Sequence, residues 1–235
     1  MIVAAVLPAI RAAQQATKSV PIVMAVSADP VGAGFVASLA RPGANITGLS
    51  NIGVDVSSKY IEFLRIAVPT LSRVAVLVNP SHPNHAGFLK TIQDAARTTG
   101  VVASSVRVSS AGEIESAFDA MRRERAEALI VLPDSLFILQ GGRIAQRAAT
   151  NRLPTMVWSR ELADAGGLIS YGQDLVEQYR RAATYVDKIL KGANPADLPV
   201  EQATKFELVI NRKSAKAIGL SIPQELVFRA DKVIE

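Results

Sequence analysis

The polar residues that follow an apolar run near the N-terminus have the types and spacing of a small-ligand site. The run Val20–Val26 is short, β-branched and bounded by turn formers, as is typical of a buried parallel strand. Ser27 and Asp29 follow it, and Pro30 suits the first position of a helix, which we expect over Pro30–Leu39. Polar turns at the carboxyl ends of parallel strands are where open α/β sheets bind small ligands. Asp29 either contacts such a ligand or only caps the helix.

The glycines of this segment fit a second chemistry, because Gly32–Ala37 matches the dinucleotide-binding pattern G-x-G-x-x-G/A. In that pattern the glycines form the tight turn directly after the strand, whereas Asp29 and Pro30 occupy that turn here. An ionised Asp29 would also repel a pyrophosphate. The sequence therefore disfavours an NAD(P)-dependent enzyme of the Rossmann type, which stays as an alternative.

Other catalytic and metal-binding chemistries find little support in the residues. Neither a G-x-S-x-G elbow nor a P-loop lysine motif occurs, so we expect no catalytic residues and no cofactor. The only histidines, His82 and His85, share one loop with no further ligand-type cluster in the sequence, which predicts no metal site. The chain has no cysteine, which excludes disulfides and thiolate metal sites.

Composition and charge describe a folded globular chain. Its 235 residues are 49% hydrophobic and 20% charged, and no apolar run reaches the roughly 18 residues that span a bilayer. The net charge of +5 is spread along the chain, and the one basic cluster, 122–125, ends a predicted amphipathic helix. Aromatic residues make up only 5% and are not interleaved with basic ones, so we expect no nucleic-acid partner.

Short apolar runs alternate with helical patterns along the whole chain, which predicts an α/β fold with doubly wound parallel sheets. Strands are predicted over 1–6, 20–26, 45–49, 73–78, 101–108, 128–132, 154–158, 168–171 and 206–210. This number of strands fits two lobes better than one open sheet. We assign 1–52 and 172–205 to the first lobe and 53–171 and 206–235 to the second, with hinges at 51–55 and 172–174. Two such lobes form a clamshell that binds a ligand between facing strand ends.

Seven segments of the chain match sequence motifs of a known family. They are Val20–Val23, Asp29–Gly34, Ser38–Ser50, Leu71–Pro80, Leu132–Asp134, Gly166–Gly172 and Lys213–Leu220. With these segments the chain resembles the substrate-binding component of a bacterial ABC transporter, and it is most similar to the family of tryptophan- and tyrosine-binding proteins. The resemblance runs over essentially the whole chain.

This resemblance implies a two-lobed periplasmic-binding-protein-like fold of type I and no enzymatic activity. It implies a protein in the periplasm or at the cell surface that captures a small organic ligand, either amino-acid-like or an aromatic carboxylate. The ligand would then be delivered to the membrane permease subunits of an import system. The sensor domain of a sugar-type repressor shares the fold and stays as a further alternative.

The N-terminus departs from the family pattern. Met1 opens directly on a strand that resembles the family's third, and residues 1–10 have no basic region before their apolar run, so they make a poor signal peptide. Leu7 stands where the family often has a small or hydroxyl residue. An incomplete first lobe would leave Met1–Val6 as an apolar sheet edge, so we expect a homodimer through this edge.

Candidate ligand contacts lie at predicted strand ends on both lobes. Asp134 could pair with a ligand ammonium or cap a helix, and Trp158 could form a stacking wall or belong to the core. Arg160 could clamp a carboxylate, although an ion pair with Glu161 or Asp164 is the simpler reading. We expect the ring of Tyr171 in the apolar part of the pocket. The full set of predicted ligand contacts is Ser27, Asp29, Ser50, Asn79, Asp134, Ser135, Trp158, Tyr171 and Asp174.

Overall fold

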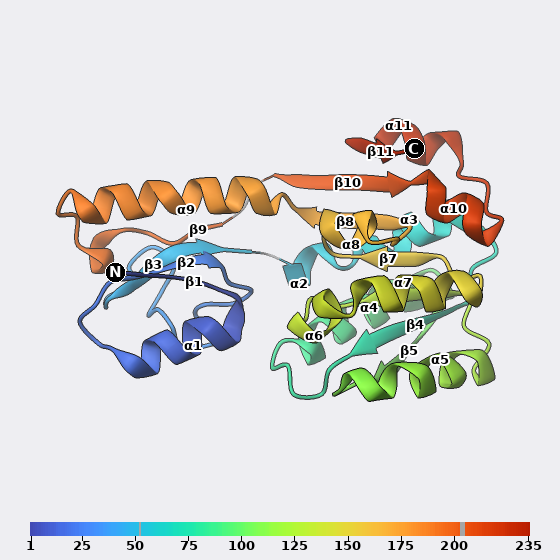
Figure 1. The fold of residues 1–235 in the computed structure, drawn as a ribbon, viewed down its shortest axis with the longest axis horizontal. Helices are drawn as coiled ribbons and strands as arrows, with labels where there is room; N and C mark the ends of the chain where they lie inside the picture. The colour runs from blue at the N-terminus through green and yellow to red at the C-terminus, as the bar shows by residue number, and fades with distance from the viewer. Residues whose placement is uncertain (52, 203–204) are drawn as a thin grey trace. The chain divides into compact units, whose positions relative to one another are not determined.

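The computed structural model describes residues 1–51, 53–202 and 205–235 and divides the chain into two compact units. Unit 1 comprises Met1–Gly53 and Gln173–Phe206, and unit 2 comprises Val54–Gly172 and Glu207–Glu235. Each unit is a sheet with helices on both faces (Figure 1). Among the described residues, no helix combines the length and the apolar character needed to cross a membrane.

Unit 1 is built on a four-stranded sheet in the order β1-β2-β3-β9, in which all neighbours are parallel. Its strands are β1 (Ile2–Ala5), β2 (Ile22–Val26), β3 (Ile46–Ser50) and β9 (Glu201–Gln202), and its helices are α1 (Val6–Ala16), α9 (Leu175–Leu190) and a short 3-10 helix over Pro195–Asp197. Successive residues of β2 point to opposite faces. Ile22 and Met24 pack on the α1 side, while Val23 and Ala25 pack on the α9 side. Two-sided burial therefore explains why this strand is apolar throughout.

The predicted helix over Pro30–Leu39 is wrong, because the chain forms a series of turns there. Asp29 Oδ1 accepts a hydrogen bond from the Gly32 N–H at 2.8 Å, which closes a single turn. Gly34 then adopts a left-handed conformation with φ of +69°, which ends any helical path. Glycine is also among the poorest helix formers, so two of them in one turn favour a loop.

Side chains of α1 hold this loop against unit 1. Arg11 donates to the carbonyl oxygen of Ala33 at 2.5 Å, and Gln14 donates to that of Gly34 at 2.8 Å. The Arg11 guanidinium also lies over the ring of Phe35, 4.5 Å from its centroid. Phe35 is buried in the unit 1 core. The segment predicted as a helix is therefore a loop that buries Phe35 and whose carbonyl oxygens accept hydrogen bonds from α1.

Unit 2 contains a seven-stranded sheet in the order β11-β10-β8-β7-β6-β4-β5. Parallel pairing joins β4 to β5 and β6, β7 to β6 and β8, and β10 to β11. The strands are β4 (Arg73–Val78), β5 (Val102–Arg107), β6 (Ala128–Val131), β7 (Thr155–Val157), β8 (Ile169–Gln173), β10 (Phe206–Asn211) and β11 (Lys232–Ile234). This order places β4 beside β6, although 49 residues lie between the last residue of β4 and the first residue of β6.

Helices cover both faces of this sheet and form two cores with its alternating side chains. One core contains α3 (Lys59–Ala67), α4 (His85–Thr98), α10 (Arg212–Ile218) and α11 (Gln224–Arg229). The other contains α5 (Ile114–Arg123), α6 (Ser135–Leu139), α7 (Gly141–Thr150) and α8 (Arg160–Asp164). Helix α2 (Gly53–Val56) and a 3-10 helix over Ala111–Glu113 complete the elements. The predicted α/β class with parallel, doubly covered sheets is confirmed.

Candidate ligand-binding site

Asn79 and Asp134 meet at the carboxyl ends of β4 and β6. Because these strands are parallel neighbours, the residues that follow them emerge at the same edge of the sheet. Asn79 Nδ2 donates to Asp134 Oδ2 at 3.0 Å. Asp134 Oδ1 accepts from the Leu136 N–H at 2.7 Å, so Asp134 is also the N-cap of α6. The side chain is only 7% exposed, and both of its oxygens are held in fixed directions.

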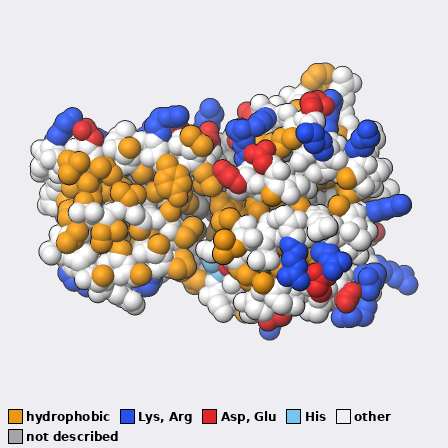
Figure 2. Space-filling model, in the orientation of Figure 1, with side chains coloured by type: hydrophobic (Ala, Val, Ile, Leu, Met, Phe, Trp, Pro, Cys, Tyr) orange, Lys and Arg blue, Asp and Glu red, His pale blue; other side chains and the backbone are white. Residues whose placement is uncertain are grey.

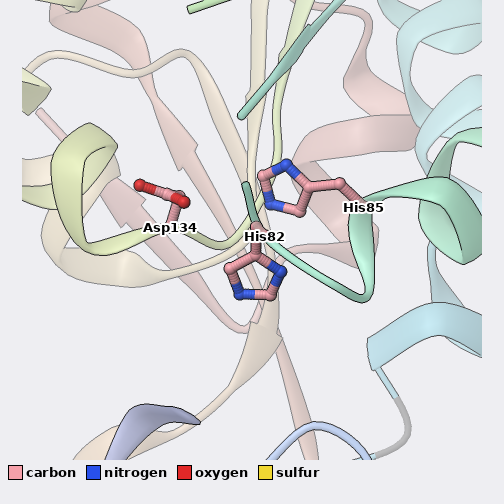
Figure 3. Close-up of side chains that lie close together, drawn as sticks. All are labelled: His82, His85 and Asp134. Atoms are coloured by element: carbon pink, nitrogen blue, oxygen red, sulfur yellow. The ribbon is translucent and has the colours of Figure 1, made fainter. Parts of the chain in front are cut away.

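His85 joins the same two strand ends through its imidazole ring (Figure 3). Its Nδ1 accepts from the backbone N–H of Asn79 at 2.8 Å, and its Nε2 lies 3.0 Å from the carbonyl oxygen of Pro133. A backbone N–H can only donate and a carbonyl oxygen can only accept, so the ring is the neutral tautomer with the proton on Nε2. His85 is 4% exposed, and burial is the main cause that lowers the pKa of this ring below its ordinary value.

The ring of His82 stacks on that of His85, with centroids 4.3 Å apart (Figure 3). Its Nδ1 accepts from the Asn84 N–H at 3.3 Å. Burial, followed by the proximity of His85, lowers the pKa of His82 to about 4. Both rings are therefore uncharged at neutral pH.

No third ligand-type residue lies near the two histidines in the sequence, but the fold brings Asp134, which follows β6, beside them. Atoms of His82, His85 and Asp134 that could bind a metal lie within 4.8 Å of one another. A zinc ion holds its ligands at roughly 2.0–2.2 Å, so the three would have to move closer together. His85 would also lose a backbone hydrogen bond, since both of its nitrogens are already used. The geometry favours a hydrogen-bonded tie between strand ends over a metal centre.

Trp158 follows β7 on the same sheet and is half-buried. Its ring packs against the cores on both faces of the sheet. Its Nε1 is buried and has no hydrogen-bond partner among the described residues. Buried polar atoms are nearly always paired in folded proteins, so this N–H is a candidate for contact with a bound molecule.

Three further predicted residues of unit 2 have other surroundings. Ser135 is exposed at the start of α6. The ring of Tyr171 packs on that of Phe63 in α3, with centroids 5.0 Å apart. Burial and the nearby carboxylate of Asp231 raise the pKa of the Tyr171 hydroxyl. The structure thus groups Tyr171 with α3 and the C-terminal segment. Arg160 lies 3.6 Å from Asp164, in the ion pair that the sequence favours.

The strand ends of unit 1 carry the remaining predicted residues. Ser27 follows β2, is 2% exposed, and has a hydroxyl with no partner among the described residues. Its carbonyl oxygen accepts from the Asn51 N–H at 2.7 Å, which joins the ends of β2 and β3 beside the buried Ser50. Asp29 is exposed and closes the turn described above. Asp174 caps α9 by accepting from the Glu177 N–H at 3.1 Å.

A comparison with known protein families identifies the family of this chain. Residues 1–234 match the sequence model of the ABC transporter substrate binding protein family. The chain belongs to this family. The family recognised from the sequence is thereby confirmed, and it is a family of binding proteins.

Individual relatives agree with this assignment. The tyrosine-binding protein of Clostridioides difficile is 27% identical over 214 residues, which cover 91% of this chain and 61% of that protein. The chain thus spans less than two thirds of the length of this curated relative. A crystal structure of an ABC domain from Streptococcus pneumoniae in complex with L-Trp superposes with a TM-score of 0.91 at 27% identity, covering 100% of this chain and 78% of that one. A conserved domain protein from Vibrio cholerae gives a TM-score of 0.90 at 27% identity, with 99% and 78% covered. The expected periplasmic-binding-protein-like fold of type I is confirmed.

Proposed function

We propose that this chain is the solute-binding part of an ABC import system and that its ligand is an aromatic or similar amino acid. The observation that carries the proposal is the likeness, over the whole chain, to a domain solved with L-Trp. The ligand would pass to the membrane permease subunits, and the protein would act in the periplasm or at the cell surface. These steps follow from the role of substrate-binding proteins in import.

The chemistry of the strand ends in unit 2 supports an amino-acid ligand. The unpaired Nε1 of Trp158 can donate to a carboxylate, and the exposed part of its ring can stack on an aromatic side chain. Among the described residues, Asp134 accepts one hydrogen bond on each carboxyl oxygen, and each oxygen has a second lone pair that can accept from a ligand ammonium. A zwitterionic amino acid with an aromatic side chain could make all three contacts, since it has a carboxylate, an ammonium group and an aromatic ring.

The strand ends of unit 1, taken by themselves, carry further candidate ligand contacts. The Ser27 hydroxyl is the strongest of them, because it is buried and has no hydrogen-bond partner in the described part of the chain. Ser50 at the end of β3 and Asp174 at the start of α9 are further candidates. We expect less from Asp29, which is exposed and occupied by its turn, and from Tyr171, whose ring is packed on Phe63.

A thermal-unfolding screen tests the ligand class. We expect L-tryptophan, L-tyrosine or L-phenylalanine to raise the melting temperature. At one hundred times Kd a ligand stabilises by about 2.7 kcal/mol, which for a chain of this size corresponds to roughly 5–10 °C. D-glucose, D-ribose and NAD serve as controls. Stabilisation by the sugars alone would favour a sugar sensor, and stabilisation by NAD alone would favour an enzyme; either result contradicts the proposal.

We also propose that two copies associate through β1. The outer strands of the two sheets are β1, β9, β5 and β11. Three of them contain a charged residue, which discourages edge-to-edge pairing, whereas β1 has none. Val3 of β1 is 51% exposed, and Figure 2 shows hydrophobic side chains gathered over unit 1 on the face in view. Because the edge of one copy matches that of another, an antiparallel β1–β1 contact closes as a two-fold dimer.

Sedimentation or light scattering at several concentrations checks this association. We expect the average mass to rise with concentration from that of a single 25.0 kDa chain toward twice that value. Val3→Lys should keep the protein monomeric, because the dimer would bury two unpaired charges. The matched control is Val102→Lys on the β5 edge, where Val102 is 60% exposed; it should leave the dimer intact. A wild-type mass that stays at one chain throughout would contradict the proposal.

A further inference from the structure

His85 ties the end of β4 to the end of β6 through both nitrogens of its imidazole ring. We propose that His85 is a positioning residue for ligand binding, which holds Asn79 and Asp134 in their binding arrangement through its two backbone hydrogen bonds. The inference rests on the proposed function, because it assumes that Asn79 and Asp134 contact the ligand. His85 itself need not touch it.

The bonds around Asn79 show why its position depends on His85. The backbone N–H of Asn79 donates to His85, its Nδ2 donates to Asp134, and its Oδ1 accepts from the Ser81 N–H at 3.0 Å. Pro133, whose carbonyl oxygen faces His85 Nε2, immediately precedes Asp134. His85 therefore fixes the backbone on both sides of the Asn79–Asp134 contact. Loss of these bonds frees both strand ends at once.

Aromatic packing holds the imidazole in this orientation. The ring of Phe137 in α6 stacks on that of His85 at 6.2 Å, and the ring of Phe88 in α4 meets it edge-on at 6.5 Å. Both phenylalanines are fully buried. These neighbours flank the imidazole, and its hydrogen bonds in this orientation depend on its protonation state.

Protonation would break the tie. An imidazolium carries a proton on Nδ1, which would point at the Asn79 N–H, so two donors would face each other. The titratable groups that face His85 are His82, which stacks on it, and Asp134, which favours its charged form. Burial outweighs Asp134 and lowers the pKa of His85. The folded protein thus keeps His85 neutral at the ordinary histidine pKa of roughly 6.5, and ligand affinity should fall only at the lower pH at which the buried ring takes up a proton.

Calorimetric titration with L-tryptophan and L-tyrosine tests the inference in the wild type and three variants. His85→Phe keeps a ring between Phe88 and Phe137 but removes both hydrogen bonds. It should bind roughly tenfold more weakly at neutral pH, the cost of leaving a buried polar group unpaired. Its affinity should also lose the acid dependence of the wild type. His85→Gln, which restores a donor and an acceptor that do not titrate, should recover part of the affinity. His82→Phe serves as the matched control and should bind like the wild type.

A folded His85→Phe protein with wild-type affinity and an unchanged pH profile would overturn the inference. If no amino acid binds the wild type, the proposed function fails, and the positioning role is read separately from ligand-free NMR. The backbone amide resonance of Asn79 should then shift with pH as His85 titrates in the wild type. The resonance should not follow this titration in His85→Gln. An Asn79 amide resonance that does not shift with pH in the wild type would also overturn the inference.

Discussion

Replacing Gly172 with alanine should lower the free energy of unfolding by about 3 kcal/mol, at the upper end of the usual cost of overpacking. Gly172 lies in β8, directly against the backbone of Trp158 after β7. A Cβ atom there would overlap the carbonyl oxygen of Trp158 and lie 2.8 Å from its carbonyl carbon. Backbone atoms cannot rotate away as a side-chain tip can, so the two strands would have to separate. Urea unfolding followed by Trp158 fluorescence measures the effect, since this is the only tryptophan of the chain.

Gly142→Ala is the matched control for this substitution. Gly142 is exposed in α7, and a Cβ atom there meets nothing within 4 Å. Alanine should therefore be neutral or stabilise by up to roughly 1 kcal/mol, the difference in helix propensity. Equal unfolding midpoints for Gly172→Ala and the wild type would show that β7 and β8 do not approach this closely.

Trp158→Ala should lower both stability and ligand affinity. The ring packs on the cores of both sheet faces, and truncating a packed tryptophan costs about 3–5 kcal/mol. Ligand binding should fall below detection, because the stacking surface and the Nε1 donor disappear together.

Trp158→Phe separates the two roles of this residue. Phenylalanine keeps most of the packing and an aromatic face but lacks the Nε1 donor. We expect its stability to change by less than about 2 kcal/mol and its ligand affinity to fall roughly tenfold. Unfolding and calorimetric titration of both variants give these numbers. A Trp158→Ala protein that loses stability but binds normally per folded molecule would assign Trp158 to the core alone.

Local sequence patterns predicted most of the fold and failed where tertiary contacts replace helical bonds. The continuous apolar run before Ser27 can only be a strand that is covered on both faces, and β2 is one. Phe35 and Val36 are buried, but in a loop and not in the predicted helix. Two carbonyl oxygens of this loop accept hydrogen bonds from the side chains of Arg11 and Gln14, which lie about twenty positions earlier in the sequence. No pattern within the segment could reveal that compensation.

Sequence patterns could single out individual candidate residues, but not the contacts between them. Asn79 and Asp134 each follow an apolar strand, whereas their hydrogen bond depends on β6 lying next to β4. The spacing of His82 and His85 was visible, but the role of His85 needs the same strand order. Tyr171 is a different case. It lies two positions after Ile169 in β8, so both side chains point to the α3 face of the sheet. The alternation of side chains along a strand is enough to predict this shared face from the sequence.

Titration of Trp158 fluorescence with L-tyrosine tests the central claim most directly, because one probe reports on both the ligand and the site. Excitation that tryptophan absorbs and tyrosine does not keeps the ligand silent. We predict a saturable change in Trp158 emission with one ligand per chain, repeated with L-phenylalanine and absent with D-glucose. Emission that stays constant up to about 1 mM of either amino acid, but changes saturably with D-glucose or NAD, would contradict the account.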